Sequence, residues 1–146
     1  MNNIETQKIV IDWQGHDYVE ATISLLDHKI QSLIVRGCAQ THYRFRDWAN
    51  VNKLIPLKEW PLPQGQHHSD MLLRELIQKA AGTWSYPYTE DELCHCRAVP
   101  TKKVDESILS GAETVQQVLN KTGAGSACGT CQIHTETLIK YRQGSW

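Results

Sequence analysis

Apolar and polar positions alternate along the first part of the chain. Residues 19–25 read VEATISL, a period of two that is typical of a strand with one face in water. Residues 8–13 and 30–35 are short β-branched runs on either side, and residues 27–29 provide a turn. The pattern predicts a three-stranded antiparallel meander over residues 8–36, and one face of such a sheet needs a covering element.

The next segment shows no regular period until a helical stripe begins. Residues 37–66 contain three prolines and several scattered apolar anchors, so we expect mostly loop, with one helical turn near residues 46–52. Ser69 can cap the start of a helix, and Gly82 suits its end. The apolar stripe between them consists of Leu72, Leu73, Leu76, Ile77 and Ala80. We expect this helix to cover the sheet.

The composition changes after the aromatic linker TWSYPYT at residues 83–89. From Leu93 onward the pattern predicts no strands, only three short helices separated by turn residues. The first begins with Thr101 as its cap, the second ends in the turn at residues 122–125, and the third begins near Gly129. The predicted fold class is α+β, with a small α+β domain at residues 1–90 and an all-α helix-turn-helix domain at residues 91–146.

Length and charge exclude several classes of protein. A chain of 146 residues with 40% hydrophobic content can form one domain or two small ones. Basic and acidic side chains number nine and ten before residue 91 and six and six from there on. Neither half has the basic excess that nucleic-acid binding needs. The sequence offers no membrane-spanning run and no signal-peptide core, so we expect a cytoplasmic protein without a membrane or nucleic-acid partner.

Four of the five cysteines form one pattern near the C-terminus. Cys94 and Cys96 flank a histidine, and Cys128 and Cys131 follow after a spacer of thirty-one residues. In a reducing compartment, cysteines are more often metal ligands than structural disulfides. Two helices folded back as a hairpin would bring the two pairs together, and four thiolates are the coordination that iron–sulfur clusters require. The sequence therefore predicts an iron–sulfur cluster on these four cysteines.

The segment LCHCRAVPTKKVDESILSGAETVQQVLNKTGAGSACGTCQIHTETLI, residues 93–139, resembles the domain named after the bacterioferritin-associated ferredoxin, which also forms the middle of NifU-type scaffolds. Members of that family show C-x-C, thirty-odd residues and C-x-x-C, with a T-G-A-G turn before the second pair, as at residues 122–125 here. The resemblance implies a helix-turn-helix fold that holds a [2Fe-2S] cluster in loops near the surface.

Other interpretations of the four cysteines compete with the cluster. A structural zinc site also takes four cysteines, but such sites usually show C-x-x-C at both ends. Two disulfides fit a cytoplasmic chain less well, and cysteines one residue apart bridge poorly to each other. His95, between two ligands, is expected to face solvent rather than to act as a fifth ligand.

The N-terminal half is similar, more weakly, to the IscU/NifU scaffold domain, which assembles a cluster on three cysteines and an aspartate. Three short motifs carry the likeness: Gly-His-Asp at residues 15–17, Arg-Gly-Cys-Ala at residues 36–39 and His-His-Ser at residues 67–69. They stand in the places of the family's C-G-D, G-C-G and H-C-S motifs, so this chain keeps one of the three cysteines. The departure puts a scaffold activity of this half in doubt.

The resemblance implies a second metal site in the N-terminal half. Asp17 and Cys38 match family ligand positions, His68 replaces the third cysteine, and the first is lost or taken by His16. Aspartate, cysteine and histidine can all bind zinc or iron. In the alternative interpretation Cys38 is a small half-buried residue after a strand, and the histidines cap the entrance of the helix.

Two functional classes follow from these patterns. The first is a non-enzymatic iron–sulfur protein of cluster assembly or delivery, whose N-terminal half docks a cysteine desulfurase or an apo-acceptor. The second is a ferredoxin-type electron-transfer module for a redox or iron-storage partner. No Ser-His-Asp, P-loop or dinucleotide signature indicates an enzyme. The sequence leaves open whether two copies associate as a homodimer.

Overall fold

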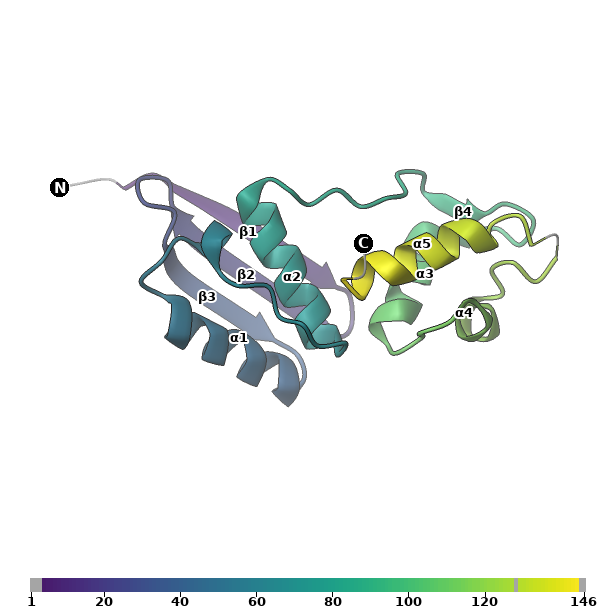
Figure 1. The fold of residues 1–146 in the computed structure, drawn as a ribbon, viewed down its shortest axis with the longest axis horizontal. Coiled ribbons are helices and arrows are strands. Elements are labelled where there is room, and N and C mark those ends of the chain that lie inside the picture. The colour runs from purple at the N-terminus through teal and green to yellow at the C-terminus, as the bar shows by residue number, and fades with distance from the viewer. Residues whose placement is uncertain (1–3, 128, 145–146) are drawn as a thin grey trace. The chain divides into compact units, whose positions relative to one another are not determined.

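A computed structural model describes residues 4–127 and 129–144, and in it the chain divides into two compact units (Figure 1). The first unit contains the residues up to Gln64 together with residues 72–84. The second contains residues 65–71 and the residues from Ser85 onward. Each unit has its own set of buried apolar side chains.

The first unit is built on the predicted meander. Its strands are β1 (Thr6–Trp13), β2 (Asp17–Ser24) and β3 (Ile30–Arg36), antiparallel and in the order β1-β2-β3. Val19 and Ala21 on the central strand are fully buried, which is the alternation that the sequence shows. The prediction of three antiparallel strands is therefore confirmed, with an irregularity of register at Ile23.

The segment after the sheet is not the loop that the sequence indicated. Helix α1 (Ala39–Asn52) covers 14 residues there, so the expectation of a single turn near residues 46–52 was wrong. The buried residues of α1 are Thr41 and Phe45, a stripe too narrow to give a clear helical period. The prolines that suggested a loop begin only at Pro56, beyond the helix, where a short 3₁₀ turn follows at Leu57–Glu59.

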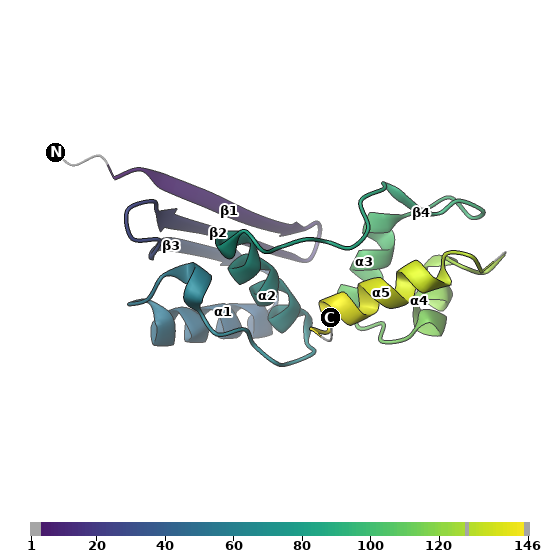
Figure 2. The same cartoon turned by 45° about the horizontal axis from the view of Figure 1, so that its top comes forward.

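Helix α2 (His68–Ala81) confirms the predicted amphipathic helix. Its apolar stripe is buried, with Leu73 and Leu76 at 0% exposure, and Gly82 follows with a φ of 72°. Ser69 is the second residue of the helix rather than its cap, so the helix starts slightly earlier than we expected. Figure 2 shows that α1 and α2 lie on the same face of the sheet.

The second unit contains three helices and one short strand pair. The helices are α3 (Thr101–Leu109), α4 (Val115–Thr122) and α5 (Gln132–Arg142), as the sequence predicted, and Val104, Val118 and Leu138 form the centre of their core. The pair β4 (Glu92–Cys94) and β5 (Val99–Pro100) corrects the expectation of no strands after Leu93. It was missed because two- and three-residue strands are too short to show alternation.

The start of α3 differs in detail from the prediction. Thr101 is the first helical residue, and Pro100 holds the N-cap position. The Thr101 hydroxyl donates to the Glu90 carbonyl at 2.6 Å, and its amide donates to the Asp91 carbonyl at 2.7 Å. These two bonds tie the start of α3 to the chain that leads into β4.

A buried ion pair joins α3 to the end of α5. Arg142, 6% exposed, donates from Nε and from one terminal nitrogen to the two carboxylate oxygens of Asp105, at 2.7 Å each. The Tyr86 hydroxyl donates to the same carboxylate at 2.7 Å. A bidentate pair of this kind fixes both distance and orientation between the two helices.

Candidate metal centre

The first pair of predicted ligands lies on the strand pair of the second unit. Cys94 is the last residue of β4 and is 2% exposed, whereas Cys96 lies in the turn between β4 and β5 and is exposed. Ala98 in the same turn has a φ of 51°, so the chain reverses tightly here. One thiol of the pair therefore faces the protein interior, and the other lies at the surface.

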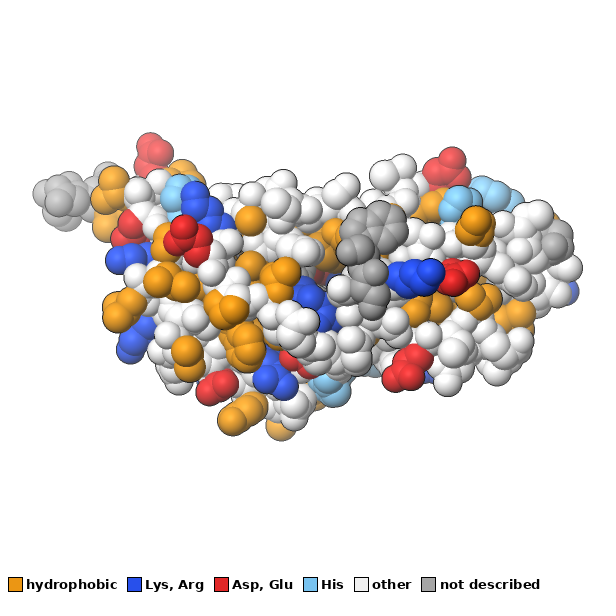
Figure 3. All heavy atoms as spheres, in the orientation of Figure 1, with side chains coloured by type: hydrophobic (Ala, Val, Ile, Leu, Met, Phe, Trp, Pro, Cys, Tyr) orange, Lys and Arg blue, Asp and Glu red, His pale blue; other side chains and the backbone are white. Residues whose placement is uncertain are grey.

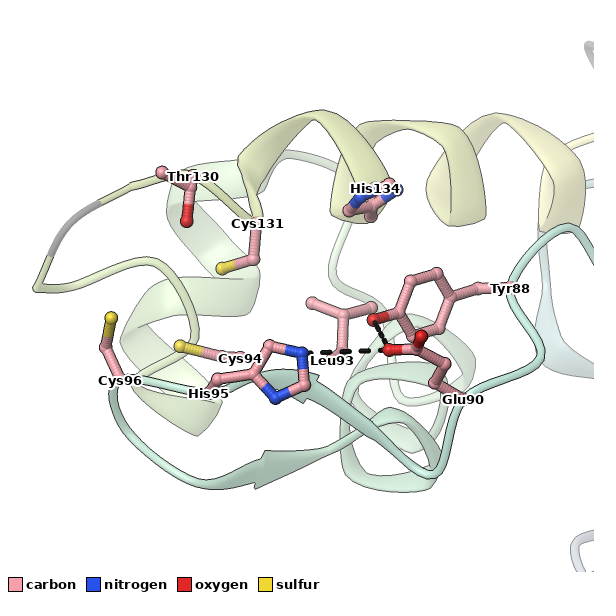
Figure 4. Close-up of a pocket in the computed structure, with 9 residues that line it drawn as sticks. All are labelled: Tyr88, Glu90, Leu93, Cys94, His95, Cys96, Thr130, Cys131 and His134. Atoms are coloured by element: carbon pink, nitrogen blue, oxygen red, sulfur yellow. Dashed lines mark hydrogen bonds and ion pairs between the residues drawn. The ribbon is translucent and has the colours of Figure 1, made fainter.

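The second pair lies just before α5. Cys131 is the N-cap of α5 and is 6% exposed. Cys128 lies outside the described residues. Figure 4 shows the sulfur atoms of Cys94, Cys96 and Cys131 facing a common space, so the structure brings together the three predicted ligands that it describes.

The backbone before the second pair supports the thiols. The amide of Gly125 donates to Cys94 Sγ at 3.5 Å. Gly125 has a φ of 82°, a conformation that favours glycine, and a Cβ there would lie 3.1 Å from the Gln132 side chain and 3.6 Å from Cys131 Sγ. A residue with a side chain would therefore crowd Gln132, the residue next to Cys131.

A cavity of about 380 Å³ opens beside the thiols (Figure 4). Besides the cysteines, it is lined by Tyr88, Glu90, Leu93, His95, Thr130 and His134. Nothing in the sequence marks Tyr88, Glu90 or His134 as neighbours of the thiols. The 40-residue separation between the segment before β4 and helix α5 hides from the sequence that they border one space.

Tyr88 forms one wall of this cavity. Its hydroxyl lies 3.1 Å from a carboxylate oxygen of Glu90 and 3.1 Å from the carbonyl oxygen of Glu92, and it can donate to either. Burial raises the pKa of Tyr88 above its ordinary value, and the hydrogen bond to Glu90 raises this pKa further. Tyr88 therefore remains a hydroxyl at neutral pH and keeps holding the chain that enters β4.

His95 faces solvent, as expected for a residue between two ligands. Its side chain is 67% exposed. Its Nδ1 lies 2.8 Å from a carboxylate oxygen of Glu92, and its Nε2 lies 3.7 Å from one of Glu90. These contacts turn the ring toward the acidic residues rather than toward the common space of the thiols.

The comparisons with known proteins identify this unit. Residues 93–141 match the BFD-like [2Fe-2S] binding domain. The match covers about a third of the chain and contains all four cysteines of the predicted set. No curated protein and no solved structure matches the chain.

The donor set of the BFD-like domain fits the cluster that its family binds. Two thiols are buried, one is at the surface, an amide donates to a sulfur, and a cavity adjoins them. Thiolate ligands with amide donors to sulfur are the usual surroundings of an iron–sulfur cluster. The chain is thus an iron–sulfur protein, and it is the C-terminal resemblance of the sequence that the comparisons confirm.

Two of the N-terminal candidates come together in the first unit. Asp17 is the first residue of β2 and is 3% exposed, and Cys38 is the exposed N-cap of α1. The Cys38 amide donates to Asp17 Oδ1 at 3.0 Å. His68 is the first residue of α2 and belongs to the second unit.

The alternative interpretations of this region are partly wrong. Cys38 is exposed, so it is not a half-buried packing residue. His67 does serve the helix start, because its Nδ1 accepts from the Ser69 amide at 3.1 Å. The His16 ring stacks on Trp13 at 4.2 Å between centroids, which gives it a packing role of its own.

Within residues 4–127 and 129–144, none of the helices has the length and the apolar character that a bilayer crossing requires.

Proposed function

We propose that this chain is a non-enzymatic iron–sulfur protein of cluster assembly or delivery. It would carry one [2Fe-2S] cluster on Cys94, Cys96, Cys128 and Cys131, and its first unit would engage the partner. The observation that carries the proposal is the presence of two separate sets of metal-competent side chains, the cysteines of the BFD-like domain and the pair Asp17 and Cys38 in the first unit. A plain electron-transfer protein needs only the first set.

The BFD-like domain gives its cluster one protected side and one open side. When bound, a [2Fe-2S] cluster supplies one-electron redox chemistry. Cys94 and Cys131 are buried and would hold it, whereas Cys96 is exposed and the adjoining cavity opens beside it. An exposed ligand beside an open cavity supports exchange with a partner, because a partner can approach this edge without unfolding the domain.

The set around Cys38 would bind a second metal ion, zinc or iron. A thiolate, a carboxylate and an imidazole are a ligand set that zinc accepts, with the fourth position open. The bond from the Cys38 amide to Asp17 Oδ1, at 3.0 Å, supports this site because it holds two of the three ligands together. An open fourth position would allow a persulfide or a partner thiol to reach the metal, which is what an assembly protein needs.

The first unit also offers a surface for a protein partner. Three large apolar side chains are strongly exposed on it, Leu26, Val51 and Leu54, at 85, 75 and 77%. They lie in the turn between β2 and β3 and at the end of α1, and Figure 3 shows hydrophobic side chains gathered over that part of the unit. Such a patch is typical of a protein-binding surface, and a cysteine desulfurase or an apo-acceptor would be its partner.

A transfer experiment tests this function against its alternative, a ferredoxin-type electron-transfer module. Holoprotein is mixed anaerobically with an apo-ferredoxin, and acceptor-bound cluster is separated and quantified. We expect the cluster to move to the acceptor, and Leu54→Glu, which changes the patch but no ligand, to slow the transfer. A cluster that cycles between two oxidation states under a chemical reductant but never leaves the protein would contradict assembly or delivery and favour electron transfer.

A further inference from the structure

The hydroxyl of Thr41 lies between two of the ligands of the proposed second metal site. Thr41, in the first turn of α1, is 0% exposed. It donates to Asp17 Oδ2 at 2.8 Å, and its oxygen lies 3.3 Å from Cys38 Sγ. One buried side chain therefore contacts both the carboxylate and the thiol.

The carboxylate of Asp17 is held at both of its oxygens. Its Oδ1 accepts from the Cys38 amide at 3.0 Å, and its Oδ2 accepts from Thr41. A carboxylate that is 3% exposed needs such donors, since a buried charge without them is costly. Gly37 makes the first bond geometrically feasible, because its φ is 140° and a Cβ there would overlap Asp17 Oδ1.

We propose that Thr41 is the positioning residue of the second metal site. Its buried hydroxyl contacts both the Asp17 carboxylate and the Cys38 sulfur, so it holds these two ligands in the arrangement that an ion would meet. This inference rests on the second site of the proposed function and assigns the placement of two of its ligands to one hydroxyl.

The test measures zinc binding calorimetrically in full-length holoprotein, whose C-terminal cysteines are occupied by the cluster. We expect Thr41→Val to weaken zinc binding about 10- to 100-fold, the usual effect of losing a hydrogen-bond partner of a ligand. Thr41→Ser retains the hydroxyl and should bind within a few-fold of the wild type. The absorption spectrum of the cluster should be the same in all variants, since Thr41 is not one of its ligands.

Further variants separate failure of Thr41 from failure of the site. Cys38→Ala removes a ligand and should abolish zinc binding. If wild-type holoprotein binds no zinc, or Cys38→Ala binds it as well as the wild type, the second site itself is refuted and the role of Thr41 falls with it. If Cys38→Ala abolishes binding but Thr41→Val binds like the wild type, only the role of Thr41 is refuted. Thr41→Ala takes the place of the valine variant if that one does not fold, and the same outcomes apply.

Discussion

The two units hold their thiols in different ways. In the first, Cys38 and Asp17 are joined to each other and to Thr41 by protein hydrogen bonds, on a sheet and helices with a well-buried core. In the second, Cys94 and Cys131 lie at the ends of a three-residue strand and of a loop. The first set is organised by the fold before any metal binds. The second set would rely on its metal to connect the segments that carry it, because binding energy in such a site is folding energy.

Removal of the cluster should have the largest effect, and it should be confined to the second unit. Small domains with few large apolar groups often rely on a metal, so the apoprotein should lose most of the helix at residues 101–142. Hydrogen exchange of holo- and apoprotein, followed by peptide, measures this. Amides of β1–β3 serve as the internal control and should keep their protection. Full protection of α4 and α5 in the apoprotein would show that their apolar contacts suffice without metal.

Loss of the ion pair between α3 and α5 should be the next largest effect. Arg142→Met leaves the Asp105 carboxylate 82% buried without its bidentate partner, and breaking a buried pair in this way costs about 3 kcal/mol of unfolding free energy. Denaturant unfolding of the holoprotein measures it. The double variant Arg142→Met with Asp105→Asn should recover part of the loss, because it removes the unpaired charge. Equal losses in the single and double variants would contradict this explanation.

Gly37→Ala should destabilise the first unit by about 2 kcal/mol, since it adds strain at a φ of 140° and a clash with Asp17. Gly15→Ala is the matched control. Gly15 also has a positive φ, 78°, but a Cβ there would meet nothing within 4 Å, so we expect a loss of only about 1 kcal/mol. Thermal unfolding of both variants provides the comparison. Equal losses would mean that the close approach to the carboxylate has no cost.

The smallest effect concerns the chemistry of one thiol. Cys38 is exposed and Cys94 and Cys131 are buried, so an alkylating reagent should modify Cys38 first in native holoprotein. Added zinc should slow that modification, because a metal-bound sulfur is less available. Peptide mass spectrometry over time follows both rates. A Cys38 that stays unmodified in metal-free native protein would contradict the second site and favour the electron-transfer alternative.

A helix or strand could be predicted from the sequence where its buried apolar residues recur at a regular spacing. The meander and α2 have several buried residues at regular spacing, and both were predicted. Helix α1 has a buried stripe of only Thr41 and Phe45 and was missed. The strand pair β4–β5 is too short to show any period. Local patterns thus predicted the elements with wide apolar faces and failed on those fixed by tertiary contacts.

The residues of the candidate sites also fall into those that the sequence predicted and those that it missed. The four C-terminal cysteines were predicted from their spacing, because thiols have few other reasons to cluster in this way. Thr41 and the pair Asp105–Arg142 were not, since their partners lie 24 and 37 residues away along the chain and only the fold brings them near. A threonine that contacts two ligands looks in sequence like any other helical threonine.

Iron and sulfide analysis of anaerobically purified protein, together with its absorption spectrum, tests the central assignment most directly. We expect about two irons and two sulfides per chain and a reddish-brown protein, because four thiolates are the coordination that a [2Fe-2S] cluster takes. Replacing any one of Cys94, Cys96, Cys128 and Cys131 by serine should bleach or destabilise this spectrum. A colourless protein that carries stoichiometric zinc on these cysteines would contradict the assignment.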